Sequence, residues 1–353
     1  MRIFCFFALT STIAANADDI IGGSGKYKFR YRPDLAQLPS SEINDDMNGH
    51  GLAFDRKNDV FYFTWQPKKL QSTSHALARF SGNGNEVSLL GIAGPDGLSA
   101  GTPHGLRLEE EYLYHANNVQ RVTKTNLDGE IVWTTSFTEW NVSYPQFWPI
   151  LPTDAIPVPG SDLLLLADGY GSSYIHFLNK TDGTFIEGMS FGGLGNATSP
   201  NVQFHTPHSV SLDHQYSAKY GCPVFAVSDR SNNRIVWVNT SGHVFNTRST
   251  LDTSPLPCNV DFSTSNGAAL VPSLGLDYSN LTRGRVTIYE DLTNSKEAAS
   301  TIEIAELIGD QGHQHPHDAI WLANGDVVVC CWSGPADPGL GPALGTISYW
   351  ERI

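Results

Sequence analysis

Short apolar runs separated by polar turns recur along this chain at a nearly constant interval. Typical runs are Leu52–Phe54, Val210–Leu212 and Ala319–Trp321. Each run directly follows a three-residue motif, here Gly49-His50-Gly51, Pro207-His208-Ser209 and Pro316-His317-Asp318. The motifs are centred on positions 50, 104, 153, 208 and 317, so the gaps between them are 54, 49, 55 and 109 residues. Because the last gap is close to twice the others, we expect a sixth, degenerate repeat near Ser263. A period of this size, filled by short strands, is typical of one blade of a β-propeller.

The pattern therefore predicts an all-β fold, a six-bladed β-propeller. The expected blades span about 45–98, 99–145, 146–200, 201–250, 251–300 and 301–353. Residues 18–44 form a polar lead-in that we expect to supply a closing strand. No long stretch with a helical period competes with this interpretation. The 33 glycines, 20 prolines and 11% aromatic residues suit many short strands joined by tight turns.

The chain has 353 residues and a formal net charge of -14. Closed all-β folds of this length often form one domain, so we expect residues 18–353 to be a single propeller domain. The negative charge disfavours nucleic acid and anionic membrane surfaces as partners, because both would repel the chain. We expect the protein to act as a monomer.

The N-terminus resembles a secretory signal peptide covering residues 1–17. Arg2 precedes the apolar stretch Ile3–Leu9, and Ala15-Asn16-Ala17 offers a cleavage site between small residues. That stretch is too short to span a bilayer. We therefore expect a secreted protein. Five glycosylation sequons agree with this route, at Asn141, Asn179, Asn196, Asn239 and Asn280.

Cleavage would remove Cys5 and leave four cysteines, namely Cys222, Cys258, Cys330 and Cys331. In an oxidising compartment four cysteines allow three pairings. A bridge between Cys222 and Cys258 is the more natural one, because neighbouring residues on a strand point to opposite faces. Buried free thiols are the alternative.

Histidine is the central residue of four of the five motifs: His50, His104, His208 and His317. The last three fall on blades two, four and six, which places them about 120° apart around one axis. Three imidazoles with an open fourth position are the pattern of a catalytic zinc site. Any one of them, taken alone, could instead cap an inner strand and bond a neighbouring loop. His50 is a candidate spare ligand or polar channel residue, and His315 could reach the same site.

Several of these blocks resemble a known family. Phe204–Leu212 and Val224–Ile235 look like an NHL repeat. Together with Pro103–Leu106, Pro152–Ala155, Ala167–Tyr170 and Pro316–Asp318 they are similar to peptidyl-α-hydroxyglycine α-amidating lyase, across about residues 48–350. The resemblance implies that His104, His208 and His317 bind zinc, and that Tyr170 and Arg230 are catalytic. It also implies a structural calcium held by Asp318 and by the backbone carbonyls of Leu52 and Leu106.

The family's reaction cleaves a carbinolamide that ends in a carboxylate, and it releases a peptide amide and glyoxylate. By resemblance, the partner is a small-molecule or peptide substrate with a terminal carboxylate. Zinc would polarise a substrate oxygen, Tyr170 would take the hydroxyl proton, and Arg230 would orient the carboxylate.

Three departures from the family pattern bear on the reaction. Trp65 stands where the family has a catalytic arginine, with Lys68 and Lys69 nearby. His315 replaces a methionine before the last Pro-His pair, and the family's two blade disulfides have no matching cysteines. The sequence thus supports two hypotheses, a secreted zinc lyase of the amidating type or a related lyase, and a secreted propeller that binds a peptide, glycan or protein without turnover.

Overall fold

A computed structural model describes residues 20–42, 48–66, 75–92, 98, 102–138, 140–274, 283–295, 297–308, 313–332 and 346–353. The predicted signal segment, Lys68, Lys69 and Asn280 lie outside these residues. Within them, no helix is both long and apolar enough to cross a membrane.

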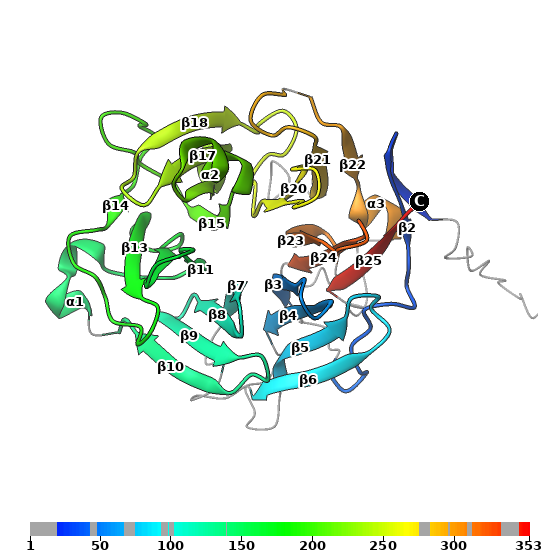
Figure 1. The fold of residues 1–353 in the computed structure, drawn as a ribbon, viewed down its shortest axis with the longest axis horizontal. Helices are drawn as coiled ribbons and strands as arrows, with labels where there is room; N and C mark the ends of the chain where they lie inside the picture. The colour runs from blue at the N-terminus through cyan, green and yellow to red at the C-terminus, as the bar shows by residue number, and fades with distance from the viewer. Residues whose placement is uncertain are drawn as a thin grey trace, which may run out of the picture.

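Six small antiparallel sheets are arranged in a ring, as Figure 1 shows. The prediction of a six-bladed propeller is confirmed. The first sheet contains β3 (Asn48–Asp55), β4 (Val60–Gln66), β5 (His75–Ser81) and β6 (Val87–Ile92). The second contains β7 (Pro103–Glu109), β8 (Tyr112–Asn117), β9 (Arg121–Asn126) and β10 (Ile131–Ser136). The third contains β11 (Asp154–Pro157), β12 (Leu163–Ala167), β13 (Tyr174–Asn179) and β14 (Phe191–Gly192). The fourth contains β15 (Pro207–Leu212), β16 (Val224–Asp229), β17 (Arg234–Asn239) and β18 (Val244–Ser249). The fifth contains β19 (Asp261–Phe262), β20 (Ala269–Ser273), β21 (Arg285–Tyr289) and β22 (Ser300–Ile302).

The sixth sheet joins the two ends of the chain. Its strands are β23 (His315–Trp321), β24 (Val327–Trp332), β25 (Ile347–Arg352), β2 (Tyr27–Tyr31) and β1 (Ile21–Ser24). Phe29 of β2 pairs with Arg352 of β25, and Tyr31 pairs with Trp350. The lead-in segment thus supplies a closing strand, as expected, and ties the first described residues to the last blade.

The few helices lie between strands of the sheets or between blades. They are α1 (Trp140–Ser143), α2 (His214–Tyr220), α3 (Ile304–Ile308) and the short 3₁₀ turns η2 (Pro145–Phe147) and η3 (Arg230–Asn232). Asp213 caps α2 by accepting a hydrogen bond from the Tyr216 N–H, and Gly221 ends it in the left-handed region that favours glycine.

The hydrophobic core lies between the blades. Phe63 and Trp65 of β4, for example, belong to the same buried cluster as Val328 of β24 and Tyr349 of β25. Each fully buried side chain of this size contributes roughly 1.5–3 kcal/mol by leaving water. Because the clusters bridge neighbouring sheets, the packing sets the relative position of the inner strands, and these strands carry the histidines.

The five motif positions lie at the start of the innermost strands, as predicted. His50, His104, His208 and His317 fall within the first residues of β3, β7, β15 and β23, and Thr153 immediately precedes β11. The sixth repeat lies near Ser263 as expected: β19 (Asp261–Phe262) is its inner strand, and Cys258 is the residue aligned with the motif centres. The Nδ1 of His208 bonds the Cys258 carbonyl, just as the Nδ1 of His104 bonds the Thr153 carbonyl and that of His317 bonds the His50 carbonyl.

Candidate metal centre

Each of the three predicted zinc ligands is held by a backbone carbonyl of the next blade. The Nδ1 of His104 lies 2.7 Å from the carbonyl oxygen of Thr153, and that of His208 lies 2.7 Å from Cys258. The Nδ1 of His317 lies 2.8 Å from the carbonyl oxygen of His50. A carbonyl can only accept, so Nδ1 carries the proton in each ring. The Nε2 lone pair is then free to bind a metal.

The three imidazoles converge on the axis. The ring centroids of His104, His208 and His317 are 4.6–4.7 Å apart in all three pairs. Burial lowers the pKa of each ring well below its usual value, so all three are neutral at physiological pH. Neutral, buried imidazoles with oriented lone pairs are the form that binds a transition metal.

His50 belongs to the same cluster. Its ring stacks on His104 at 5.1 Å and meets His317 at 4.7 Å. One ligand nitrogen from each of His50, His104 and His317 lies within 4.8 Å of the others. Both ring nitrogens of His50 are buried without a partner among the described residues, and burial lowers its pKa to about 3. Among the described residues, His50, His104 and His317 are thus the histidines whose ligand atoms lie close enough to share one metal ion, and the predicted ligand His208 is not in this group. His208 lies beside it, with its ring centroid 4.7 Å from those of His104 and His317.

Tyr170 and Arg230 extend this cluster toward the mouth of the channel. Tyr170 follows β12, and its hydroxyl lies 3.1 Å from the Nε2 atoms of both His104 and His208. The Nη1 of Arg230, in η3, donates to this hydroxyl at 3.2 Å. Tyr170 as a whole is 36% exposed, whereas its hydroxyl bonds the buried histidines. Burial raises the pKa of Tyr170, and Arg230 opposes this effect, so the phenol is protonated at neutral pH.

The donor set fits a cation because it holds more lone pairs than protons. Tyr170 has one hydroxyl proton, yet its oxygen faces the Nε2 lone pairs of both His104 and His208. The Nε2 of His317 is buried with no hydrogen-bond partner among the described residues. An unpaired buried nitrogen costs about 1–3 kcal/mol, and a metal ion would satisfy it.

Two residues singled out from the sequence, His315 and Trp65, lie apart from this cluster. His315 packs against Trp332 at a centroid distance of 5.4 Å, with its Nδ1 3.3 Å from the Leu274 carbonyl, and it is not among the histidines that converge. Trp65 is fully buried and stacks on Phe63. It supplies no charge in place of the arginine that the family carries there.

A second polar layer lies along the channel beyond the histidines, and it contains Asp318. The Asp318 carboxylate accepts from the N–H groups of Leu52 (2.9 Å) and Ala319 (2.8 Å) and from the side-chain amide of Asn259. Burial raises the pKa of Asp318 to about 7, and Arg107 is the largest opposing influence.

Arg107 reaches from blade two across the channel in this layer. Its Nη2 donates to Asp154 at 2.5 Å, to Asn259 at 2.8 Å and to Ser211 at 3.4 Å. Asp154 also accepts from the Val210 N–H at 2.9 Å. Through these residues and Asp318, one hydrogen-bonded network connects all six blades.

This network does not fit the calcium site that the resemblance implies. The Asp318 carboxylate already accepts the Leu52 N–H, and the guanidinium of Arg107 already supplies a positive charge. Calcium requires six to eight oxygen ligands. We therefore place no calcium at Asp318, Leu52 and Leu106.

The predicted disulfide is also absent. Cys222, Cys258, Cys330 and Cys331 are all free thiols, and the last three are buried. Cys222 lies before β16 in blade four, whereas Cys258 lies beside the axis in blade five, so packing keeps them apart. The alternative of buried free thiols agrees with the structure.

Two features of the site escaped the sequence interpretation. Pro257-Cys258-Asn259 has the same form as Pro316-His317-Asp318, so the proline alone could have located the sixth repeat. Arg107 follows the calcium-site position Leu106 directly, and no local signal distinguishes it from a surface arginine. Its role depends on contacts with residues that are 47 to 152 positions away.

The fold and the histidine cluster define the class of this protein as a six-bladed β-propeller. No family model and no curated protein sequence matches the chain. Among solved structures it is similar to streptogramin B lyase, with a TM-score of 0.57 and 12% identity over 94% of this chain and 100% of that one. A protein of unknown function from Bacteroides caccae has a TM-score of 0.50 and 13% identity, over 78% and 89% of the two chains. A chain of a nidogen/laminin complex has a TM-score of 0.50 and 16% identity, over 81% of this chain and 94% of that one. Identities this low establish the fold alone.

Proposed function

We propose that this chain is a secreted, zinc-dependent lyase of the amidating type, which cleaves a carbinolamide next to a terminal carboxylate. One observation carries the proposal. Buried imidazoles from alternate blades share their Nε2 atoms with the hydroxyl of Tyr170, and Arg230 holds that hydroxyl from the solvent side. The streptogramin B lyase likeness supports only the propeller fold.

The roles of the residues follow from their positions. Arg230 would bind a substrate carboxylate at the mouth of the channel, because a guanidinium donates paired N–H groups to a carboxylate. In this proposal Tyr170 takes the hydroxyl proton of the carbinolamide, and His104, His208 and His317 would hold the metal, with His50 as a further candidate ligand. Zinc, when bound, supplies Lewis acidity and a positive charge that favours the anionic form of the nearby phenol.

A space of about 180 Å³ lies beside the cluster, and we expect the terminal unit of a substrate to enter it. Its lining includes Tyr170, Arg230, His317 and Trp332. The aromatic and cationic groups on this wall suit a substrate that has an apolar body and a carboxylate end. The terminal glycine unit would enter first, with the remaining peptide left outside the channel.

The first experiment measures metal and turnover on the same purified protein. We expect about one zinc per chain, and His208→Ala should reduce it sharply because two imidazoles hold zinc poorly. An α-hydroxyglycine peptide should release glyoxylate, and chelation should abolish the release until zinc is restored. Unchanged zinc content in His208→Ala would refute the metal assignment.

A binding propeller without turnover is the second candidate, and Trp65 is the observation that favours it. The position that carries an arginine in the amidating lyases is here a fully buried indole, so Arg230 is the one cation described beside Tyr170. Zinc binding without glyoxylate release, in a protein with the fold intact, would support this candidate or a different carboxylate-bearing substrate.

A further inference from the structure

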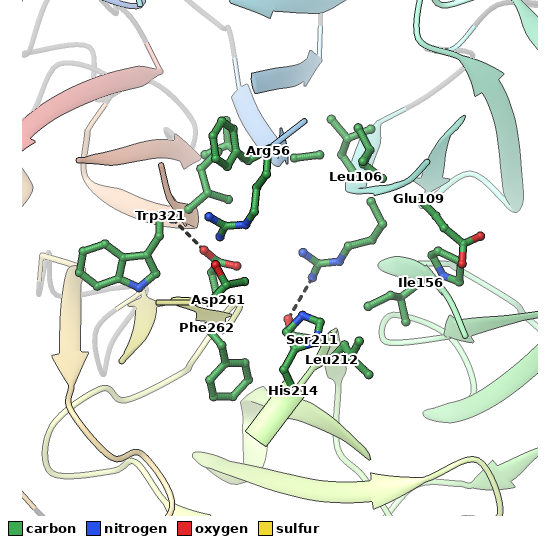
Figure 2. A pocket seen from close by; sticks show the side chains of 18 of the residues that line it. Arg56, Leu106, Glu109, Ile156, Ser211, Leu212, His214, Asp261, Phe262 and Trp321 are labelled. Carbon is green, nitrogen blue, oxygen red and sulfur yellow. Dashed lines mark hydrogen bonds between the residues drawn. The ribbon is translucent and has the colours of Figure 1, made fainter. Parts of the chain in front are cut away.

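A second pocket opens at the opposite end of the channel from the histidines. It lies where the six inner strands end, between residues 52–56, 106–109, 156–159, 211–214, 261–264 and 320–321. Figure 2 shows this pocket with its side chains. Its volume is about 260 Å³. Sites for drug-sized ligands start at roughly 300 Å³, so this one suits a smaller molecule.

Opposite charges face this pocket without neutralising one another. Arg56 lies over the ring of Phe54 at 5.2 Å, and it has no hydrogen bond or ion pair with any residue that the structure describes. Asp261 is held by the Trp321 N–H, which donates to its Oδ2 at 2.7 Å. Figure 2 shows Arg56 and Asp261 pointing toward the same space. They are more than an ion-pair distance apart, because the structure records no salt bridge between them.

Arg107 adds a second guanidinium at the floor of the pocket. Its Nε and Nη2 bond the axial layer, whereas Nη1 has no partner among the described residues. The other carboxylate at the rim, Glu109, is occupied by Lys180 at 2.8 Å. The pocket therefore offers N–H donors from two arginines and the Asp261 carboxylate, which accepts backbone N–H groups but has no ion pair among the described residues.

Burial of the Asp261 carboxylate costs folding free energy whenever the group is charged. Burial raises its pKa to about 6, and the Arg56 and Arg107 charges offset this only in part. A partly buried carboxylate that its own protein does not fully compensate is characteristic of a binding site, where a ligand supplies the missing charge.

We propose that this pocket binds a small zwitterion of the amino-acid type with an apolar side chain. Its ammonium group would pair with Asp261, and its carboxylate would bind Arg56 and Arg107. The apolar walls formed by Ile156, Leu212, Phe262 and Trp321 would cover the side chain. The site is separated from the histidines by the axial polar layer, so this inference does not rest on the proposed lyase activity.

Three probes of one shape separate the possible ligand chemistries. L-Phenylalanine carries both charges, 3-phenylpropionate lacks the ammonium group, and phenethylamine lacks the carboxylate. Isothermal titration of the zinc-loaded protein should show binding of phenylalanine, with each single-charge analogue weaker by about tenfold or more. Equal binding of 3-phenylpropionate would overturn the zwitterion assignment in favour of an anion site, and equal binding of phenethylamine would overturn it in favour of a cation site.

Two substitutions test the residues directly. Arg56→Met keeps the apolar stem and removes the charge, and Asp261→Asn keeps the shape. Each should weaken phenylalanine binding by about tenfold or more while leaving the zinc content unchanged. Arg79→Met is the matched control, because Arg79 forms an exposed ion pair with Asp128 and does not line the pocket. Affinity unchanged in both pocket variants, or no binding of any probe up to about 10 mM, would overturn the proposal.

Discussion

Arg107→Met tests whether the axial polar layer holds the ring of blades together. The substitution removes the guanidinium but keeps an unbranched apolar stem of similar length. Asp154, which is only 1% exposed, would lose its ion pair at 2.5 Å and retain the N–H groups of Val210 and Ala155. Asn259 and Ser211 would lose a donor at the same time.

The magnitude follows from the burial of the partner. Removing one member of a buried ion pair costs about 3–5 kcal/mol, because the other charge stays buried and uncompensated. The unfolding entropy of globular proteins is roughly 2 cal/mol/K per residue, or about 0.7 kcal/mol/K for a chain of this length. The expected loss therefore lowers the melting temperature by about 4–7 °C.

Urea unfolding, followed by both tryptophan fluorescence and circular dichroism, measures this loss. Coincident transitions establish that a single free energy of unfolding describes the protein. Arg79→Met is the control, because the exposed ion pair between Arg79 and Asp128 should contribute less than about 1 kcal/mol. Arg107→Lys should fall between the wild type and Arg107→Met, since lysine keeps the charge but lacks the planar fork.

Two results would refute this reasoning. One is a loss in Arg107→Met no larger than in Arg79→Met, which would mean that solvent or other groups compensate Asp154. The other is a clear rise in the melting temperature of the wild type on addition of calcium, because an ion that binds the folded state stabilises it. That rise would place calcium in the layer that we assign to the guanidinium.

Three further predictions concern the rest of the channel. Asp261→Asn should stabilise the protein by about 1–3 kcal/mol at pH 7.5. The pKa of Asp261 in the folded protein, about 6, exceeds its value in the unfolded chain, so the wild type loses stability as the pH rises through 6. In urea unfolding the difference between the two proteins should therefore vanish below about pH 4. Tyr170→Phe should lower turnover of an α-hydroxyglycine peptide and leave zinc content unchanged by metal analysis; a parallel loss of zinc would make Tyr170 a ligand. Cys222→Ser should leave the melting temperature within about 1 °C of the wild type, whereas a large drop would reveal a disulfide.

The repeat and its histidines were accessible from the sequence because they are local and periodic. A blade needs an inner strand every fifty residues or so, and the histidine-centred motifs identify four of these strands. Repeat number alone then gives the angles between blades, so the convergence of His104, His208 and His317 could be predicted. For His50 the sequence left two alternatives open, a spare ligand or a polar channel residue, because the direction of its ring depends on a rotamer set by packing.

The chain by itself determined the propeller, the number of blades and the ring of histidines, since these follow from spacing along one strand type. The tertiary structure decided which charges meet on the axis. Arg107, Asp154, Asn259 and Asp318 come from four blades, and their pairing depends on side-chain directions that no local pattern encodes. The same applies to Arg56 and Asp261 at the far mouth. A periodic strand pattern can be recognised from neighbouring residues in the sequence. The charge pairs across the ring form only after all six blades have closed around the axis.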